Sequence, residues 1–468
     1  MKKLTVWALL AMLVIAGSAF AAPVGVVGNA TFDTGNPTTT DNDDSCDIGV
    51  APAATLLLPY FEVAQSGNET TLFTITNTSA EEQIAHVTLW TDYSFPVIDF
   101  NIYLTGYDVQ AINLHDIIWR GIIAPDLGTG TDVSDVGDFS VDNPDLDLDN
   151  CDELPGRLPD VYVLRMQQAF TLGRVAAFGN AAACNTIGGT HTNAVGYATI
   201  DVANLCSINL PTSAEYFLTE IMFDNVLVGD YQQVNSANNF AQGNPMVHIR
   251  AIPEGGLPGD PVDTNFDRTF YSRYQPLGGG LFGTADRRQP LPSVFAGRWI
   301  NGSTSDFQTS YKIWREGVVT AGAVSCAAWP NNVTSITESV IFDEEENPEG
   351  VAPSEVISPP LTSTFTLPET SLTRVTDTTV FPRPTTGAVA GWVYLNLDND
   401  EGDGISSQNW VVVSMRAEGR YSVDFDAAWL ANGCSAEFGT SEVNTPGGIV
   451  IGPAVAEDPT NPVENFNP

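Results

Sequence analysis

Two groups of closely spaced aspartates are the residues of this sequence whose type and spacing could bind a metal. Carboxylates alternate along DLDLDNCDELPG, and they recur in the glycine-rich segment NLDNDEGDGI. Carboxylates at such spacing can converge on a hard cation, and calcium takes its ligands from oxygen atoms. We therefore predict a calcium-stabilised protein with candidate ligands Asp145, Asp147, Asp149, Asp398, Asp400 and Asp403. Solvated acidic loops are the alternative for both segments.

Both segments are similar to known calcium-binding loops. DLDNCDELPG resembles the D-x-D-N-C piece of thrombospondin type 3 repeats, without the D-G turn of that family. The second segment resembles the D-x-D-x-D-G-I loops of dockerins and EF-hands, with its third carboxylate displaced along the chain. No glutamate occupies the last position of an EF-hand loop, so the resemblance implies calcium coordination without an EF-hand.

Motifs of the common enzyme classes are missing from the sequence. It has no G-x-S-x-G, no H-E-x-x-H, no P-loop and no Rossmann glycine pattern after a strand. His115 precedes Asp116, which could orient it as a base, but no nucleophile is identifiable. The other histidines, His86, His191 and His248, are scattered along the chain. These observations favour a non-catalytic protein and leave an enzymatic activity uncertain.

Alternating apolar and polar residues in the segment 71–114 predict an antiparallel β meander. Phe73 and Ile75 alternate with threonines, and Val87 and Leu89 share one face of the next run. Polar turns separate the runs, so the strands should pair antiparallel with one face on a core. A sheet of this kind normally buries that face against a second sheet. We predict an all-β fold of tandem antiparallel β-sandwich domains, immunoglobulin-like or jelly-roll-like, with long acidic loops.

The start of the sequence predicts export. Lys2 and Lys3 precede an apolar run that ends in small residues before Ala21, which is typical of a signal peptide. The run is too short to span a bilayer well, so no membrane insertion of the mature chain is expected. We predict a periplasmic, cell-surface or extracellular protein. Its expected parts are a signal peptide (1–21), a flexible leader (22–45), a first β-sandwich domain (46–301) with an acidic loop (124–157), a second β-sandwich domain (302–439) and a disordered tail (440–468).

One segment could form either a helix or a strand. Asp160 could cap a helix over 160–172 and Gly173 could end it. The run Val161-Tyr162-Val163 favours a strand instead. Further strands are expected at 310–315, 333–342, 391–397 and 409–415, with a hairpin over 415–423.

Six cysteines follow the predicted signal peptide: Cys46, Cys151, Cys184, Cys206, Cys326 and Cys434. An even number of cysteines in an oxidising compartment predicts disulfide bonds and no free thiol. Pairing within each predicted domain favours Cys184–Cys206 and Cys326–Cys434, which leaves Cys46–Cys151. No C-x-x-C motif is present, so zinc and redox sites are disfavoured.

Acidic residues greatly outnumber basic ones. The chain has 57 Asp and Glu against 18 Lys and Arg, a net charge of −39. Loss of Lys2 and Lys3 with the signal peptide would take the charge to −41 and leave Lys312 as the last lysine. Such a charge argues against nucleic acid as a partner and favours calcium, cationic partners or a solvated acidic surface. The dense basic spot Asp286-Arg287-Arg288 is expected to pair internally, with a phosphate or sulfate site as the alternative.

Three segments resemble an uncharacterised group of exported bacterial proteins: VAPAATLLLPYFEV, IFDEEENP and NWVVVSMRAEGRYSVDFDAAWLANGC. The resemblance extends over most of the mature chain and brings no activity with it. We predict a non-catalytic structural or adhesive protein, with other surface proteins or glycans as partners. The alternative is a secreted protein that binds or hydrolyses glycans. Trp90 and Tyr103 would then stack on a sugar ring. Paired carboxylates would hydrolyse the glycosidic bond.

Overall fold

The computed structural model describes the chain in segments between residues 49 and 431. No helix among these residues is long and apolar enough to cross a membrane. The predicted signal peptide, leader, acidic loop and tail lie outside them. The described residues are 49–123, 158–177, 183–205, 209–211, 213, 216–251, 269–274, 286, 288–302, 306–317, 326, 329–330, 333–336, 338–350, 366–378, 380–381, 387–397, 407–417 and 421–431.

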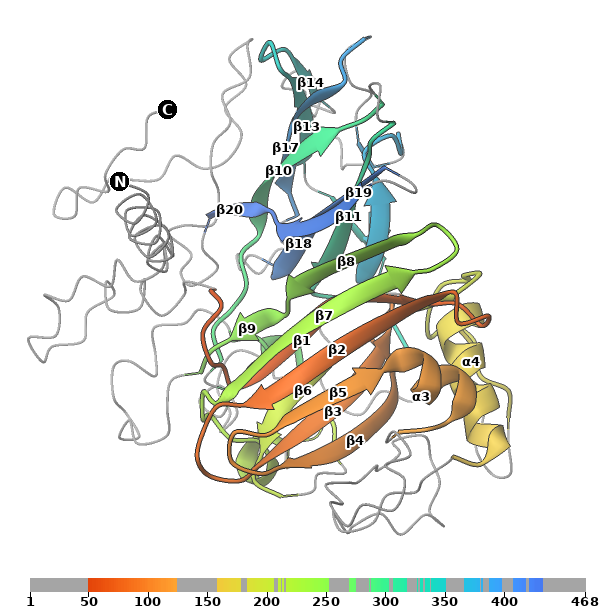
Figure 1. The fold of residues 1–468 in the computed structure, drawn as a ribbon, viewed down its shortest axis with the longest axis vertical. Coiled ribbons are helices and arrows are strands. Elements are labelled where there is room, and N and C mark those ends of the chain that lie inside the picture. Colours follow the sequence, from red (N-terminus) through yellow and green to blue (C-terminus); the bar gives the residue numbers. More distant parts are fainter. Residues whose placement is uncertain are drawn as a thin grey trace, which may run out of the picture.

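The described chain is mostly β, and its strands pair antiparallel, as predicted (Figure 1). The N-terminal part forms two sheets, which we call sheet 1 and sheet 2. Sheet 1 has the order β4 (Pro96–Leu104), β3 (Gln83–Thr91), β6 (Ala194–Ala203), β1 (Thr55–Val63) and β9 (Val247–Ile249). Sheet 2 has the order β5 (Val109–Asn113), β2 (Glu69–Asn77), β7 (Leu227–Asn235) and β8 (Phe240–Pro245).

The C-terminal part forms two larger sheets and a small one. Sheet 3 has the order β14 (Pro348–Gly350), β13 (Glu338–Asp343), β17 (Ala390–Asn396), β10 (Val294–Ile300) and β20 (Ala428–Ala431). Sheet 4 has the order β16 (Thr370–Arg374), β11 (Gln308–Arg315), β18 (Asn409–Ala417) and β19 (Tyr421–Asp426). The two-stranded sheet joins β12 (Val333–Ser335) to β15 (Thr366–Pro368). Strand β10 thus belongs with the C-terminal strands, although the predicted first domain runs to residue 301; the division into two domains stays a prediction.

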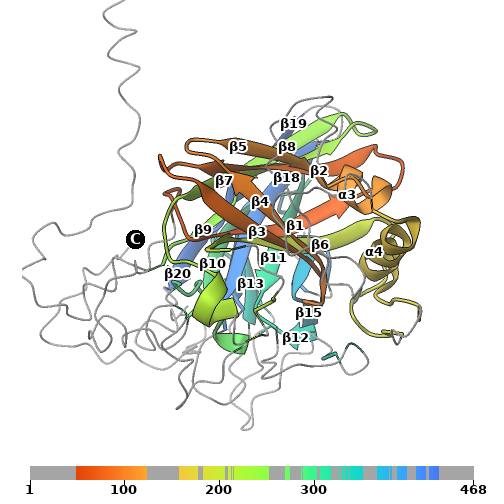
Figure 2. The ribbon, with the colours of Figure 1, turned by 90° about the horizontal axis from the view of Figure 1, so that it is seen from below.

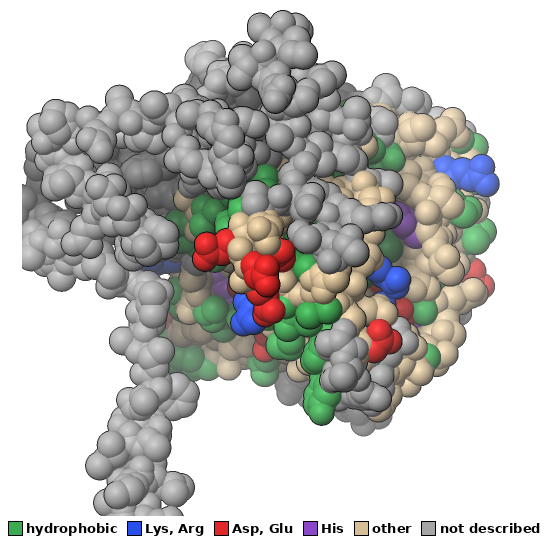
Figure 3. Space-filling model, turned by 90° about the horizontal axis from the view of Figure 1, so that it is seen from above, with side chains coloured by type: hydrophobic (Ala, Val, Ile, Leu, Met, Phe, Trp, Pro, Cys, Tyr) green, Lys and Arg blue, Asp and Glu red, His purple; other side chains and the backbone are tan. Residues whose placement is uncertain are grey.

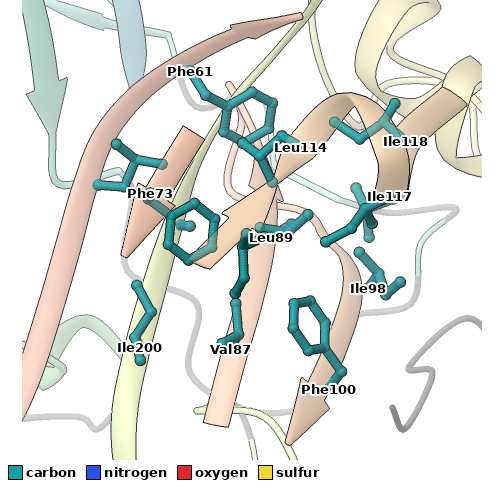
Figure 4. Packing of buried hydrophobic residues seen from close by; sticks show 14 of the residues in the cluster. Phe61, Phe73, Val87, Leu89, Ile98, Phe100, Leu114, Ile117, Ile118 and Ile200 are labelled. Atoms are coloured by element: carbon teal, nitrogen blue, oxygen red, sulfur yellow. The ribbon is translucent and has the colours of Figure 1, made fainter. Parts of the chain in front are cut away.

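The first hydrophobic cluster lies between sheets 1 and 2. Phe73 of β2, Val87 and Leu89 of β3 and Ile200 of β6 are fully or almost fully buried in it. Figure 4 shows these side chains directed toward one another, with Leu114 closing one end. Full burial of each such side chain stabilises the fold by about 1.5–3 kcal/mol. The alternation in the sequence therefore predicted this cluster correctly.

Two α-helices in the described chain cover the end of that cluster: α3 (Leu114–Arg120) and α4 (Asp160–Leu172). Helix α3 was not predicted from the sequence. Asn113 caps it by accepting a hydrogen bond from the His115 N–H. Helix α4 resolves the ambiguity at 160–172 in favour of a helix. It ends at Gly173, whose φ of +59° is left-handed and whose N–H donates to the Ala169 carbonyl. Two short helical turns, η2 (Tyr216–Glu220) and η4 (Ser272–Tyr274), follow later in the chain.

Sheet 1 is buried on both faces, which the sequence did not predict. In β3, the outer residues His86, Thr88 and Trp90 are no more than 1% exposed. The expectation of one solvated face was wrong for this strand, because later segments of the chain cover it: the ring of Tyr216 packs against His86 and the ring of Tyr274 stacks on Trp90. Trp90 belongs to a second hydrophobic cluster with Tyr311 of β11 and Val413 of β18, so side chains of both parts share one core. Figure 2 shows strand β11 lying close to β1, where the two parts meet.

Strand β1 also contacts the C-terminal part through an irregularity in its pairing. Its register against β6 shifts between Leu58 and Phe61, where Pro59 lies in the strand. Proline cannot donate to the ladder and is typical of such shifts. The Pro59 carbonyl accepts a hydrogen bond of 2.5 Å from the Thr370 hydroxyl of β16. The irregularity thus supplies a direct bond between sheets 1 and 4.

A disulfide joins Cys184 to Cys326, with a Cα–Cα distance of 5.1 Å. The predicted pairs Cys184–Cys206 and Cys326–Cys434 were therefore wrong. The prediction assumed that residues after 301 pair among themselves, but the segment holding Cys326 packs on the N-terminal part. Trp329 in that segment belongs to the first cluster and donates to the Tyr93 carbonyl at 2.8 Å. The other four cysteines lie outside the described residues, so the three-bond framework stays a prediction.

Replacing Cys184 and Cys326 together with alanine is expected to lower the free energy of unfolding by about 2–5 kcal/mol. The bond spans 142 residues, so its loss frees a long loop in the unfolded chain. Urea unfolding under non-reducing conditions measures the change. An unfolding midpoint equal to that of the unaltered protein would contradict the expected role of this bond.

Candidate functional site at the junction of the sheets

The aspartates predicted as calcium ligands lie outside the described residues. These residues are Asp398, Asp400, Asp403, Asp145, Asp147 and Asp149. Calcium at these two loops stays a prediction. Among the residues that are described, no group of three or more His, Cys, Asp or Glu side chains is placed to hold a metal.

The four histidines lie apart and each contacts its own neighbours. His86 is buried, and its Nδ1 lies 2.9 Å from the Asn101 side-chain oxygen. His248 lies 2.7 Å from the Met246 carbonyl through Nδ1 and accepts from the Gly229 N–H at 3.2 Å through Nε2. The two remaining rings lie beside carboxylates: His191 of Asp92 and His115 of Asp116. Nothing in this arrangement forms a catalytic constellation.

Trp90 is unavailable to a ligand. Its indole is fully buried between the rings of Tyr197 and Tyr274, with centroid distances of 5.9 and 6.2 Å. The indole N–H donates to the Thr199 hydroxyl at 2.9 Å. The predicted sugar platform of Trp90 with Tyr103 was therefore wrong, because Tyr197 and Tyr274 enclose Trp90.

Arg288 is the centre of a buried charged group at this junction. It is 0% exposed, and its guanidinium lies 3.3 Å from an Asp201 oxygen and 3.2 Å from an Asp286 oxygen. Tyr216 and Tyr271 donate to the other Asp201 oxygen at 2.5 and 2.6 Å. Burial lowers the pKa of Arg288, but the two carboxylates outweigh it and raise the pKa overall. The expected internal pairing of this basic spot is confirmed for Arg288 with Asp286; Arg287 is not described.

Arg273 and Glu369 form a second buried pair that joins the two parts of the chain. The Arg273 guanidinium contacts a Glu369 oxygen directly and also donates to the hydroxyls of Tyr197 and Tyr274, at 2.9 and 2.6 Å. Tyr197 in turn donates to Glu369 at 3.1 Å. Burial raises the pKa of Glu369, and Arg273 opposes that rise. Glu369 precedes β16 whereas Tyr197 lies in β6, so this group links sheet 4 to sheet 1.

Lys312 is another buried cation. It is 1% exposed, and its ammonium lies 2.5 Å from Asp424 on β19, within sheet 4. The ammonium also lies 5.2 Å from the ring centroid of Tyr231 on β7 of sheet 2. A cation over an aromatic face is attracted to it, more strongly when both are desolvated. Lys312 therefore ties sheet 4 to sheet 2.

A small polar cleft adjoins these groups where β1, β2, β7 and β8 meet sheet 4. Asn193 donates to Glu62 at 2.7 Å and to Glu69 at 3.3 Å, so these two carboxylate oxygens lie at most 6.0 Å apart, the sum of the two distances. Burial and the Glu62 carboxylate raise the pKa of Glu69. The cavity volume of the cleft is about 20 Å³, which is room for water but not for a sugar ring.

The outer surface contrasts with this junction. On the face drawn in Figure 3, acidic side chains gather beside hydrophobic ones and basic side chains occur singly. The cations Arg273, Arg288 and Lys312 are no more than 5% exposed. Basic side chains are scarce in this sequence, and these three are used inside the molecule.

No family model matches the sequence, and no curated protein or solved structure matches it either. Its function therefore has to follow from its own residues.

The buried histidines predict a loss of stability in acid. Burial lowers the pKa of His86, against Asn101, Asp201 and Glu220, which raise it; burial also lowers the pKa of His248. A folded-state pKa below the unfolded value of about 6.5 gives stability that is complete above that pH and is lost as the pH falls through the folded pKa.

The raised pKa of Asp426, about 6, acts in the opposite direction over the same range, so the contribution of the histidines is measured as a difference in slope between variants, by urea unfolding in steps from about pH 7 to pH 5. The variant His86→Gln should show a shallower decline than the unaltered protein. The variant His115→Gln, which keeps both buried histidines, is the matched control and should keep the slope. Equal slopes for all three proteins would contradict the assignment to His86.

Proposed function

We propose that the protein is an exported, non-catalytic structural or adhesive protein of two β-sandwich domains, located in the periplasm or at the cell surface and stabilised by calcium. The observation that carries the proposal is the use of its charged groups. Arg273 and Lys312 connect sheet 4 to sheets 1 and 2, and Arg288 ties the segment before β10 to β6 of sheet 1. All three are buried and paired with carboxylates, so they hold the fold together and do not face a substrate. The two hydrophobic clusters, one between sheets 1 and 2 and one reaching sheets 3 and 4, support the sandwich architecture.

Retention of the purified protein on cells of its own source tests an adhesive role. Natively folded protein should sediment with those cells in the presence of calcium, in competition with the unlabelled protein. Heat-unfolded protein at the same concentration is the control and should stay in solution. Failure of the folded protein to bind cells, isolated envelopes or immobilised envelope proteins would contradict the adhesive proposal.

Glycan hydrolysis is a second candidate, and the pair of Glu62 and Glu69 is the observation that favours it. Retaining glycosidases hold two carboxyl groups about 5–5.5 Å apart, one of them with a raised pKa. The upper limit of 6.0 Å between oxygens of the two glutamates is compatible with this separation, and burial raises the pKa of Glu69. The small volume of the cleft opposes this candidate, because a sugar ring would have to displace its walls.

Release of reducing sugar from a panel of glycans tests this second candidate. Activity that disappears in Glu62→Gln and in Glu69→Gln, and persists in Glu82→Gln, would establish it. Glu82 is an exposed carboxylate of the same part of the chain and serves as the matched control. Absence of release by the unaltered protein would remove glycan hydrolysis from consideration.

A further inference from the structure

A short piece of the C-terminal part lies on the N-terminal sheets. It comes between β11 and β12, and we call its described residues 326, 329 and 330 the strap. Cys326 of the strap is bonded to Cys184, and Trp329 is 7% exposed within the first hydrophobic cluster. Because β11 and β12 both belong to the C-terminal part, the chain crosses to the N-terminal part at the strap and returns.

The strap is docked on the turn between β3 and β4. The indole N–H of Trp329 donates to the Tyr93 carbonyl at 2.8 Å, and its ring meets that of Phe95 edge to face with centroids 5.2 Å apart. Among the described residues, no strand pairing includes the strap. Apart from the disulfide, its attachment to the turn therefore consists of the hydrogen bond, the ring contact and the burial of Trp329.

The disulfide keeps Trp329 close to this turn. Cys184 is fixed on the N-terminal part, because it exchanges two backbone hydrogen bonds with Val175, at 2.9 and 3.0 Å. Cleavage of the disulfide leaves Trp329 tethered only along the chain, so its effective concentration at the turn falls. The remaining contacts then have to offset the conformational entropy that the freed segment regains. We expect the strap to leave the turn, while the strands, which do not pair with it, keep their hydrogen bonds.

The two sulfur atoms differ in their access to a reductant. Cys184 is 4% exposed, whereas Cys326 is only partly buried. The thiolate of an external dithiol attacks the Sγ of Cys326, forms a mixed disulfide and displaces the thiolate of Cys184, which takes up a proton. The second thiolate of the dithiol attacks the mixed disulfide and releases Cys326 as a thiol. The dithiol becomes a disulfide, and the two electrons and two protons that it loses reduce the two cysteines.

We propose that the bond between Cys184 and Cys326 is a redox switch: oxidation docks Trp329 on the turn between β3 and β4, and reduction by a dithiol releases the strap while the sheets stay folded. Release uncovers Tyr93 and Phe95, which pack against the first hydrophobic cluster, and so exposes an apolar edge of that cluster. The buried ion pairs of the junction do not involve the strap and hold the sheets together in both states. The switch does not depend on the proposed function.

Tryptophan fluorescence of the mature protein before and after treatment with dithiothreitol at neutral pH tests the switch. The expected result is a shift of the emission to longer wavelength as Trp329 enters water, with an unchanged far-UV circular dichroism spectrum. Alkylation with iodoacetamide and mass spectrometry confirm that Cys184 and Cys326 have become thiols. Removal of the reductant and addition of oxidised glutathione should reverse the shift.

Variants assign the shift to the strap. Trp329→Phe should lose most of the redox-dependent change in emission. Trp119→Phe is the matched control and should keep the change, because Trp119 also packs against the first cluster but donates to the Val63 carbonyl. Cys184→Ser with Cys326→Ser should show the shifted emission without reductant, and dithiothreitol should shift it no further. If this double variant does not fold, the reduced unaltered protein still gives the answer.

Three outcomes would overturn the proposal. The first is an unchanged emission although Cys184 and Cys326 are both alkylated, which would mean that Trp329 stays docked without the bond. The second is loss of the β-sheet signal on reduction, which would make the bond a support of the whole fold. The third is resistance of the bond to dithiothreitol in the folded protein. None of them bears on binding to cells, so failure of the switch and failure of the adhesive role are distinguishable.

Discussion

Arg288→Met is expected to lower the free energy of unfolding by about 3–5 kcal/mol, as is typical when one member of a buried ion pair is removed. The substitution keeps a side chain of similar length but leaves the carboxylates of Asp201 and Asp286 without their cation. The hydroxyls of Tyr216 and Tyr271 still donate to Asp201, but they bring no positive charge. Urea unfolding at neutral pH measures the loss.

Arg120→Met is the matched control for this prediction. Arg120 pairs with Asp116 at 2.7 Å, but its side chain is 57% exposed, and exposed pairs contribute at most about 1 kcal/mol. The triple variant Arg288→Met, Asp201→Asn, Asp286→Asn removes the unpaired charges and should recover part of the loss. If Arg288→Met costs no more than Arg120→Met, Arg288 does not hold the junction.

Lys312→Met is expected to have a similar effect, about 3–5 kcal/mol, for the same reason. It leaves Asp424 buried without its cation and removes the contact with the ring of Tyr231. Lys312→Met with Asp424→Leu replaces the pair by apolar groups, and such replacements are often neutral or stabilising.

Comparison of the single and double variants separates the two explanations of a Lys312 effect. If burial of an unpaired carboxylate causes the loss, the double variant regains most of the stability. If the contact with Tyr231 causes it, the double variant stays as unstable as Lys312→Met, and Tyr231→Leu should show the same deficit. An unaltered urea midpoint in Lys312→Met would contradict both.

The alternation of apolar and polar residues made the strands of the N-terminal sheets predictable from the sequence. It did not predict which other residues cover these sheets. Phe73 and Ile75 show the period of a half-buried strand, and the structure buries them in the first cluster. His86, Thr88 and Trp90 occupy the other face of β3 and look like solvent-facing residues by the same rule. His86 is covered by the ring of Tyr216 and Trp90 by the ring of Tyr274. Both covering residues are more than one hundred positions away, so no local pattern indicates them.

The buried ion pairs between the sheets correspond to one feature of the sequence, namely basic residues within apolar or aromatic runs. Lys312 stands in the largely apolar strand segment SYKIWR, and Arg273 stands among aromatics in TFYSRY. In a chain so poor in basic residues, a cation within an apolar run indicates a buried pair. Its partners could not be predicted, since Glu369 and Asp424 are distant in sequence and are only two of 57 acidic residues. The pairing of Cys184 with Cys326 escaped prediction for the same reason.

Differential scanning calorimetry tests the central claim most directly, namely that the N-terminal and C-terminal sheets form one unit held by the buried ion pairs. The claim predicts a single transition whose calorimetric and van't Hoff enthalpies agree. It also predicts that Arg288→Met and Lys312→Met each shift that whole transition to lower temperature. Two separate transitions, one of them unmoved by both substitutions, would contradict it.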